Sequence, residues 1–176
     1  EHIGKNAFFL SRITSIDIPS SVTSIGEGAF RSTILESIEL PPFLKTISKM
    51  TFYYCKKLTN VKIPSSVLCI EDNAFEECSS LESIEIPSSV TKIGSSCFSR
   101  CGSLLSIRIP QSVTSIGFHA FSNCKSLESI NIPSSITEIS TGVFANCSSL
   151  ESIVIPSSVV KISSYVFEGC TSLENI

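Results

Sequence analysis

The chain is poor in the residues that mark several functional classes. Its 176 residues include no tryptophan, one methionine, two histidines and only 16% charged side chains. No apolar run approaches the roughly 20 residues of a transmembrane helix. The formal net charge of −3 argues against nucleic acid as the main partner, because that partner calls for a basic patch. Neither an initiator methionine nor a signal peptide precedes Glu1, so we expect a piece of a longer protein.

The motifs of common enzymes and cofactor sites are also missing. The sequence has no G-x-G-x-x-G, no phosphate-binding P-loop and no H-E-x-x-H zinc motif. A catalytic serine needs a base and a group that orients the base, and His2 and His119 do not provide a convincing pair. The eight cysteines contain no C-x₂-C pair of the kind that binds zinc. We therefore predict a protein without enzymatic activity, metal or cofactor.

What the chain has is a repeat with a period of 23 residues. One unit, Pro87–Ile109, follows the template P-S-S-V-x-x-I-x-x-x-A-F-x-x-C-x-x-L-x-S-I-x-I. Six complete units run from Pro19 to Ile155, a fragment (Glu1–Ile18) precedes them, and a nearly complete unit (Pro156–Ile176) follows. No linker interrupts the array. We predict a single domain over residues 1–176, with about eight units, the first partial, and no clear caps.

Each unit contains the pattern of a half-buried β-strand. Apolar and polar residues alternate in Leu81–Ile86, and the proline that follows cannot donate a sheet hydrogen bond. Because this strand returns every 23 residues, its copies must lie side by side in a parallel sheet on one wall of a solenoid. Val90–Ile93 is a candidate for a second, shorter ladder. The apolar spacing in Gly94–Cys101 predicts about one helical or 3₁₀ turn on the opposite wall, and hence an α/β-type repeat solenoid.

The template resembles the leucine-rich repeat, specifically the 23-residue class of BspA-like and treponemal surface proteins. The match extends over essentially the whole chain, and one unit shows it at Leu81, Ile84, Ile86, Pro87, Val90, Ile93, Phe98 and Cys101. The resemblance implies an arc-shaped solenoid with the L-x-S-I-x-I strands on its concave face. It also implies a cell-surface or secreted adhesin that binds a host matrix or cell-surface protein. The family shares no catalytic residues.

Six of the eight cysteines occupy one repeated position, which predicts free, buried thiols rather than a disulfide framework. Disulfides between neighbouring units would be close enough, but stacked side chains point in parallel, which disfavours them. Cys97 fills the position of the buried alanine. Cys69 falls on an outward position and is the one thiol we expect to be exposed. Serine pairs follow the proline in five units, and we expect them to bond turn backbone. They are Ser20-Ser21, Ser65-Ser66, Ser88-Ser89, Ser134-Ser135 and Ser157-Ser158.

The candidate binding residues occupy outward positions of the repeated strand, where their character varies from unit to unit. They are Asp17, Glu39, Asn60, Lys62, Glu85, Arg108, Asn131 and Val154. A variable strip beside a nearly constant serine column suits recognition of a protein partner. Three alternatives stay open. In the first, the strip is a solvated sheet face without a partner. In the second, the array is a spacer that projects another domain. In the third, the chain is an intracellular scaffold or regulatory subunit, because free cysteines suit the reducing cytoplasm.

Two further features break the template. Tyr53, Tyr54, Phe118 and Tyr165 stand at positions that are otherwise polar, and they are candidates for anchor contacts at an interface. Scattered exposed aromatic residues are also common on surfaces without a partner. Asn146-Cys147-Ser148 fits the N-glycosylation pattern, which matters only for a chain secreted by a eukaryote.

Overall fold

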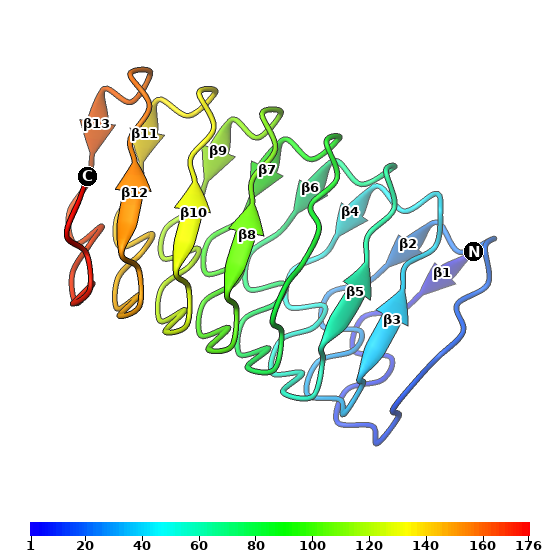
Figure 1. Cartoon of the computed structure of the whole chain (residues 1–176). Helices are drawn as coiled ribbons and strands as arrows, with labels where there is room; N and C mark the ends of the chain where they lie inside the picture. Colours follow the sequence, from blue (N-terminus) through cyan, green and yellow to red (C-terminus); the bar gives the residue numbers. More distant parts are fainter.

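The computed structural model describes residues 1–176 and shows a solenoid whose strands form two parallel ladders (Figure 1). The L-x-S-I-x-I segments supply β3 (Ser37–Glu39), β5 (Asn60–Lys62), β8 (Ser106–Arg108), β10 (Ser129–Asn131) and β12 (Ser152–Val154). The second ladder contains β1 (His2–Ile3), β2 (Ser24–Ile25), β4 (Thr46–Ile47), β6 (Cys69–Ile70), β7 (Lys92–Ile93), β9 (Ser115–Ile116), β11 (Glu138–Ile139) and β13 (Lys161–Ile162). The coils follow a gently curved row, with the two termini at opposite ends.

The repeat period sets the register of both ladders. Ile130 of β10 pairs with Ile107 of β8 on one side and with Ile153 of β12 on the other, each 23 residues away. These central side chains are buried while their strand neighbours are exposed, because successive residues of a strand point to opposite faces. The predicted parallel sheet and the shorter second ladder are both present. We call the outward surface of the β3, β5, β8, β10 and β12 ladder, with residues 15–18 and 83–86, the strand face.

The expected helical or 3₁₀ turn is absent, and this part of the prediction was wrong. The structure contains no helix, and therefore none that is long and apolar enough to cross a membrane. In the unit of Phe98, Ser96 and Arg100 have φ angles of 52° and 59°. This left-handed conformation interrupts a helical run on both sides of the phenylalanine. The amide of Phe98 donates instead to the carbonyl of Ala120 in the next coil. We call this wall of successive turns the turn wall.

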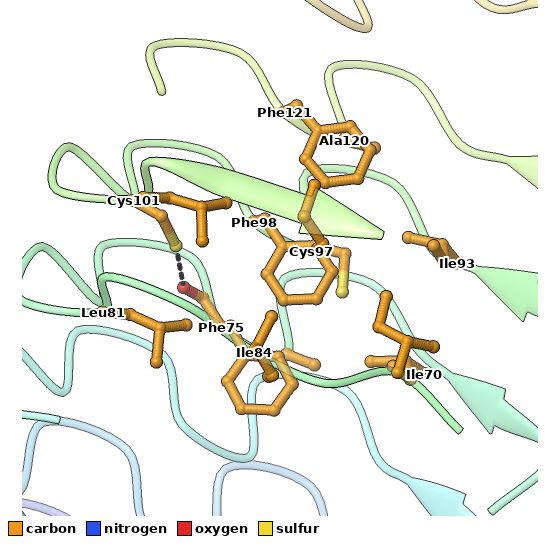
Figure 2. Packing of buried hydrophobic residues seen from close by; sticks show 14 of the residues in the cluster. Ile70, Phe75, Leu81, Ile84, Ile93, Cys97, Phe98, Cys101, Ala120 and Phe121 are labelled. Atoms are coloured by element: carbon orange, nitrogen blue, oxygen red, sulfur yellow. Dashed lines mark hydrogen bonds between the residues drawn. The ribbon is translucent and has the colours of Figure 1, made fainter. Parts of the chain in front are cut away.

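The interior is one continuous core of 45 buried residues. Phenylalanine side chains of neighbouring coils stack along it, with ring centroids 5.2 to 5.9 Å apart. Figure 2 shows this stack at Phe75, Phe98 and Phe121. Each aromatic pair contributes about 0.5–1.5 kcal/mol beyond the area that it buries. A single coil could not bury its apolar face alone, so the stacking between coils holds the array together.

The repeated cysteines connect neighbouring coils. The thiol of Cys101 donates to the carbonyl of Phe75 at 3.2 Å (Figure 2), and the same bond recurs at all six cysteines of this position. All eight cysteines are free, as predicted, and all but Cys69 and Cys170 are buried. Burial raises the pKa of the ladder thiols, that of Cys147 to about 12. They are therefore protonated donors at neutral pH.

In five units the serine two residues after the proline bonds backbone, as predicted, but it does so in the preceding coil. Ser89 donates its hydroxyl to the carbonyl of Val67 at 2.6 Å, and Ser112 donates to Val90 at 2.7 Å. One recurring serine position of the template is thus explained by a contact between coils that repeats along the solenoid. Two neighbouring coils are thus joined by one hydrogen bond from the cysteine thiol and another from the serine hydroxyl.

Candidate protein-binding face

All eight residues predicted as a binding strip have exposed side chains on the strand face. Asn60 and Lys62 lie at the two ends of β5. The backbone of Glu85 pairs with that of Arg108 in β8 as an isolated parallel β-bridge. Asp17 precedes the first strand of this ladder. The structure therefore brings the strip together as one line of neighbouring side chains along the solenoid axis. Whether this line binds a partner stays a prediction.

The strip is mixed in charge, and its charges meet across coils. The ammonium of Lys62 lies 2.6 Å from a carboxylate oxygen of Glu39, with both side chains about 70% exposed. Glu85 and Arg108 occupy neighbouring ladder positions without forming a close ion pair. Exposed pairs contribute only about 0–1 kcal/mol to stability, so these charges are available for a partner at little structural cost.

Three open grooves follow this face from coil to coil. They have volumes of about 440, 630 and 400 Å³. The first lies beside Asp17 and Glu39, the largest between β5 and Ser83–Ile86, and the third beside Arg108. Each is lined by the ends of the strands and by the proline-serine turn that follows. The face is thus hollowed along the same line that carries the variable residues.

The largest groove coincides with an interruption of the ladder. At the next coil joints, Leu105 N–H donates to Glu82 C=O and Glu128 N–H donates to Leu105 C=O, each at 3.1 Å. No backbone hydrogen bond joins residues 59–63 to residues 82–86. Backbone donors and acceptors there lack a partner in the sheet and are free to bond a ligand or water. The sequence carries no obvious signal for this interruption.

The arrangement offers little to catalysis. His2 Nδ1 lies 2.9 Å from the hydroxyl of Ser24, but no carboxylate bonds the other ring nitrogen to orient the imidazole. No group of three or more His, Cys, Asp or Glu side chains is arranged to hold a metal ion. Cys69 and Cys170 are the two partly exposed thiols, and burial still raises the pKa of both. Only Cys69 was expected from the sequence to be exposed.

Of the four aromatic residues predicted as anchors, three are clearly exposed. Tyr54, Phe118 and Tyr165 have exposed fractions of 42%, 58% and 67%. Tyr53 is half-buried and stacks against Tyr54 at 6.2 Å between ring centroids. These residues belong to the turn wall or its edge and not to the strand face. Phe118 and Tyr165 stand apart from the two neighbouring tyrosines.

The comparisons with known proteins agree with this architecture. The model of the BspA type leucine rich repeat region matches residues 1–114 and 91–176, with six copies. No curated protein sequence matches the chain. A leucine-rich repeat protein of Treponema pallidum is 30% identical with a TM-score of 0.91, over 98% of this chain and 82% of the other. One from Bacteroides ovatus is 33% identical with a TM-score of 0.88.

The Bacteroides similarity covers 98% of this chain but 47% of that protein, so the chain spans about half of it. The pneumococcal vaccine antigen PcpA is 22% identical with a TM-score of 0.53, over 98% of this chain and 58% of the antigen, and supports the fold alone. The family model, by contrast, covers every unit of the repeat. The chain is therefore a member of the BspA-type leucine-rich repeat family.

Proposed function

We propose that this repeat region is a non-enzymatic module that binds a protein partner through its strand face. The observation that carries the proposal is the line of exposed, variable side chains that runs beside the grooves of this face. Solenoids present such extended surfaces to partners, and leucine-rich repeats are typical protein-interaction modules. The mixed charge of the strip favours a partner with its own alternating charges over a polyanion.

We further propose that the partner is a host matrix or cell-surface protein and that the module is displayed at a cell surface or secreted. This part of the proposal is supported by the family resemblance alone. The alternative is an intracellular scaffold or regulatory subunit that uses the same face. Protease treatment of intact cells that express the full-length protein distinguishes the two, because only a displayed module is cleaved while the membrane is intact.

The binding test inverts the charge pattern at the centre of the strip. The double variant Glu85→Lys/Arg108→Glu keeps the net charge of the module. A charge on the bound protein that faced Glu85 or Arg108 now faces a residue of its own sign. Against a panel of purified matrix proteins in biolayer interferometry, we expect saturable binding of the wild type by at least one protein. We expect the double variant to bind it at least about tenfold more weakly, the effect of losing one well-packed charged contact.

The matched control is Glu138→Lys/Lys161→Glu on the second ladder, where the two side chains pair at 2.7 Å. This swap alters charge to the same extent on another wall, and we expect it to change affinity by less than about twofold. If the wild type and the strand-face variant bind equally well, the strand face is not the binding site. Binding to no matrix protein would contradict the adhesin and favour the intracellular alternative.

A further inference from the structure

A group of aromatic and cationic side chains covers the turn wall of the first three coils. We call it the arginine–aromatic cluster, and it consists of Phe9, Leu10, Arg31, Tyr53, Tyr54 and Lys56. Its centre is the template position that follows the stacked phenylalanine. In the next four coils this position holds Glu76, Ser99, Ser122 and Ala145. The large side chains are thus confined to one end of the array and are no requirement of the repeat.

The guanidinium of Arg31 lies between two aromatic rings. It stands 5.2 Å from the ring centroid of Phe9 in the preceding coil and 5.0 Å from that of Tyr53 in the next. Both distances are within the range of cation–π attraction. The three side chains share one template position, so the spacing of the coils alone places the cation between the rings. Arg31 is therefore fixed before any partner arrives, which lowers the entropic cost of binding.

Arg31 has no anion of its own. Two other cations of this wall have a carboxylate: Arg100 pairs with Glu77 at 2.8 Å, and Lys56 lies 4.0 Å from the same residue. Arg31 forms no ion pair and its Nε is buried, so the donors left for a partner are those of its two terminal Nη groups, which form no hydrogen bond within the protein. A fixed guanidinium with unused donors is the group that recognises a carboxylate through two parallel hydrogen bonds.

Exposed apolar side chains surround this cation. Phe9, Leu10 and Tyr54 have exposed fractions of 43%, 64% and 42%. Lys56 lies 4.2 Å from the ring centroid of Tyr54, and Glu77 already opposes its charge, which leaves Arg31 as the cation of the cluster without a carboxylate. None of the larger grooves of the molecule includes a residue of the cluster. An open surface of arginine, tyrosine and other large side chains has the composition of a protein interface hot spot and lacks the enclosure that small ligands need.

From these contacts we infer that the arginine–aromatic cluster is a second binding site, which takes an acidic segment of a partner protein. The segment presents an Asp or Glu carboxylate to Arg31, with apolar side chains beside it that cover Leu10 and Tyr54. This site lies on the turn wall and does not depend on the strand face. A partner that used both surfaces would surround one end of the solenoid.

The test uses a phage-displayed library of random 12-residue peptides selected on the wild-type protein. We expect enrichment of peptides that combine Asp or Glu with aromatic or aliphatic residues. A synthetic copy of the leading peptide should bind the wild type and lose at least about tenfold in affinity with Arg31→Gln, measured by isothermal titration calorimetry. Arg31→Lys retains charge but not the planar fork, and a partial loss is expected.

The matched control is Arg100→Gln, which removes a cation from the same wall where it already has a carboxylate partner, and binding should change by less than about twofold. If Arg31→Gln lowers the melting temperature, Tyr54→Ser at the exposed edge tests the same site and should also weaken binding. Peptides that bind Arg31→Gln and Tyr54→Ser like the wild type would overturn the proposal. Arg31-dependent binding of heparin or inorganic phosphate, without peptide binding, would also overturn it in favour of a non-protein anion.

Discussion

A buried thiol at the repeated cysteine position acts both as a small apolar side chain and as a donor to the neighbouring coil. Cys147 packs at 0% exposure and donates to the carbonyl of Phe121 at 3.2 Å. Thr33 stands at this position one coil before the first cysteine, and its hydroxyl lies 3.3 Å from the sulfur of Cys55. Ser11, at the next position toward the N-terminus, has a buried hydroxyl without a partner. The position selects a small donor, and cysteine combines donor and apolar character.

The raised thiol pKa predicts a loss of stability at alkaline pH. The ordinary thiol pKa is 9.0, and burial raises that of Cys147 to about 12. Between these values the unfolded chain releases a proton that the folded chain keeps, so stability is full below about pH 9 and falls as pH rises toward 12. We expect this thiol alone to contribute a slope of up to about 1.4 kcal/mol per pH unit. Cys147→Ser keeps a donor that does not titrate, and its urea-derived unfolding free energy should fall less steeply. Equal slopes in the two proteins would contradict the prediction.

At the scale of the element, the strand pattern predicts which side chains are buried. Ile84 is 7% exposed, and Ser83 and Glu85 on either side are exposed. Replacing Ile84 with Asp removes a buried apolar side chain and places an unpaired charge in the core, so we expect a loss of about 3 kcal/mol or more. Ser83→Asp is the matched control, because it adds the same charge at an exposed position and should change stability by less than about 0.5 kcal/mol. Equal melting temperatures for the wild type and Ile84→Asp would refute the assigned facing.

The strands could be predicted from the sequence because alternation and the 23-residue period both act through side chains. The turn wall could not, because its shape depends on backbone angles that residue types there do not indicate. Ser96 and Arg100 adopt left-handed conformations although neither is glycine. Their backbone N–H groups donate hydrogen bonds to the carbonyls of Phe118 and Ser122 in the next coil, which hold this conformation. Three equivalent positions do hold glycine (Gly28, Gly142 and Gly169), which was the available signal.

The candidate binding residues were only partly predictable for a related reason. The strip from Asp17 to Val154 follows from strand alternation, and the structure places all of it on one face. Arg31 was missed because its ring partners, Phe9 and Tyr53, stand 22 residues away on each side. Aligning the position after each phenylalanine would have found all three. Neither the grooves nor the ladder interruption has such a signal, since each depends on how two whole coils approach one another.

At the scale of the whole molecule, the two ladders are interrupted together at one joint near the N-terminus and at different joints elsewhere. The strand face is interrupted between β5 and Ser83–Ile86, where the second ladder continues from β4 through β6, β7 and β9. The second ladder is interrupted between β9 and β11, where β8 and β10 are paired, and between β2 and β4, where residues 15–18 of the strand face are not paired with β3 either. The phenylalanine stack runs through every joint. The phenylalanine stack therefore continues across the joints where a ladder is interrupted and holds the coils together there.

The place of a coil in the array also determines how accessible its cysteine is. Cys124 is buried between two neighbours, whereas the equivalent Cys170 is half-exposed in the last coil, and Cys69 is half-exposed at its outward position. Reaction requires the thiolate, and burial raises the pKa of the interior thiols most strongly. In native alkylation followed by mass spectrometry, we expect two thiols to react first, at Cys69 and Cys170, and the interior six only after unfolding. Cys69→Ser should leave Cys170 as the single fast site, while Cys124→Ser should leave the fast phase unchanged. Six or more fast thiols in the native protein would mean that the ladder is open to solvent and that the assigned core is wrong.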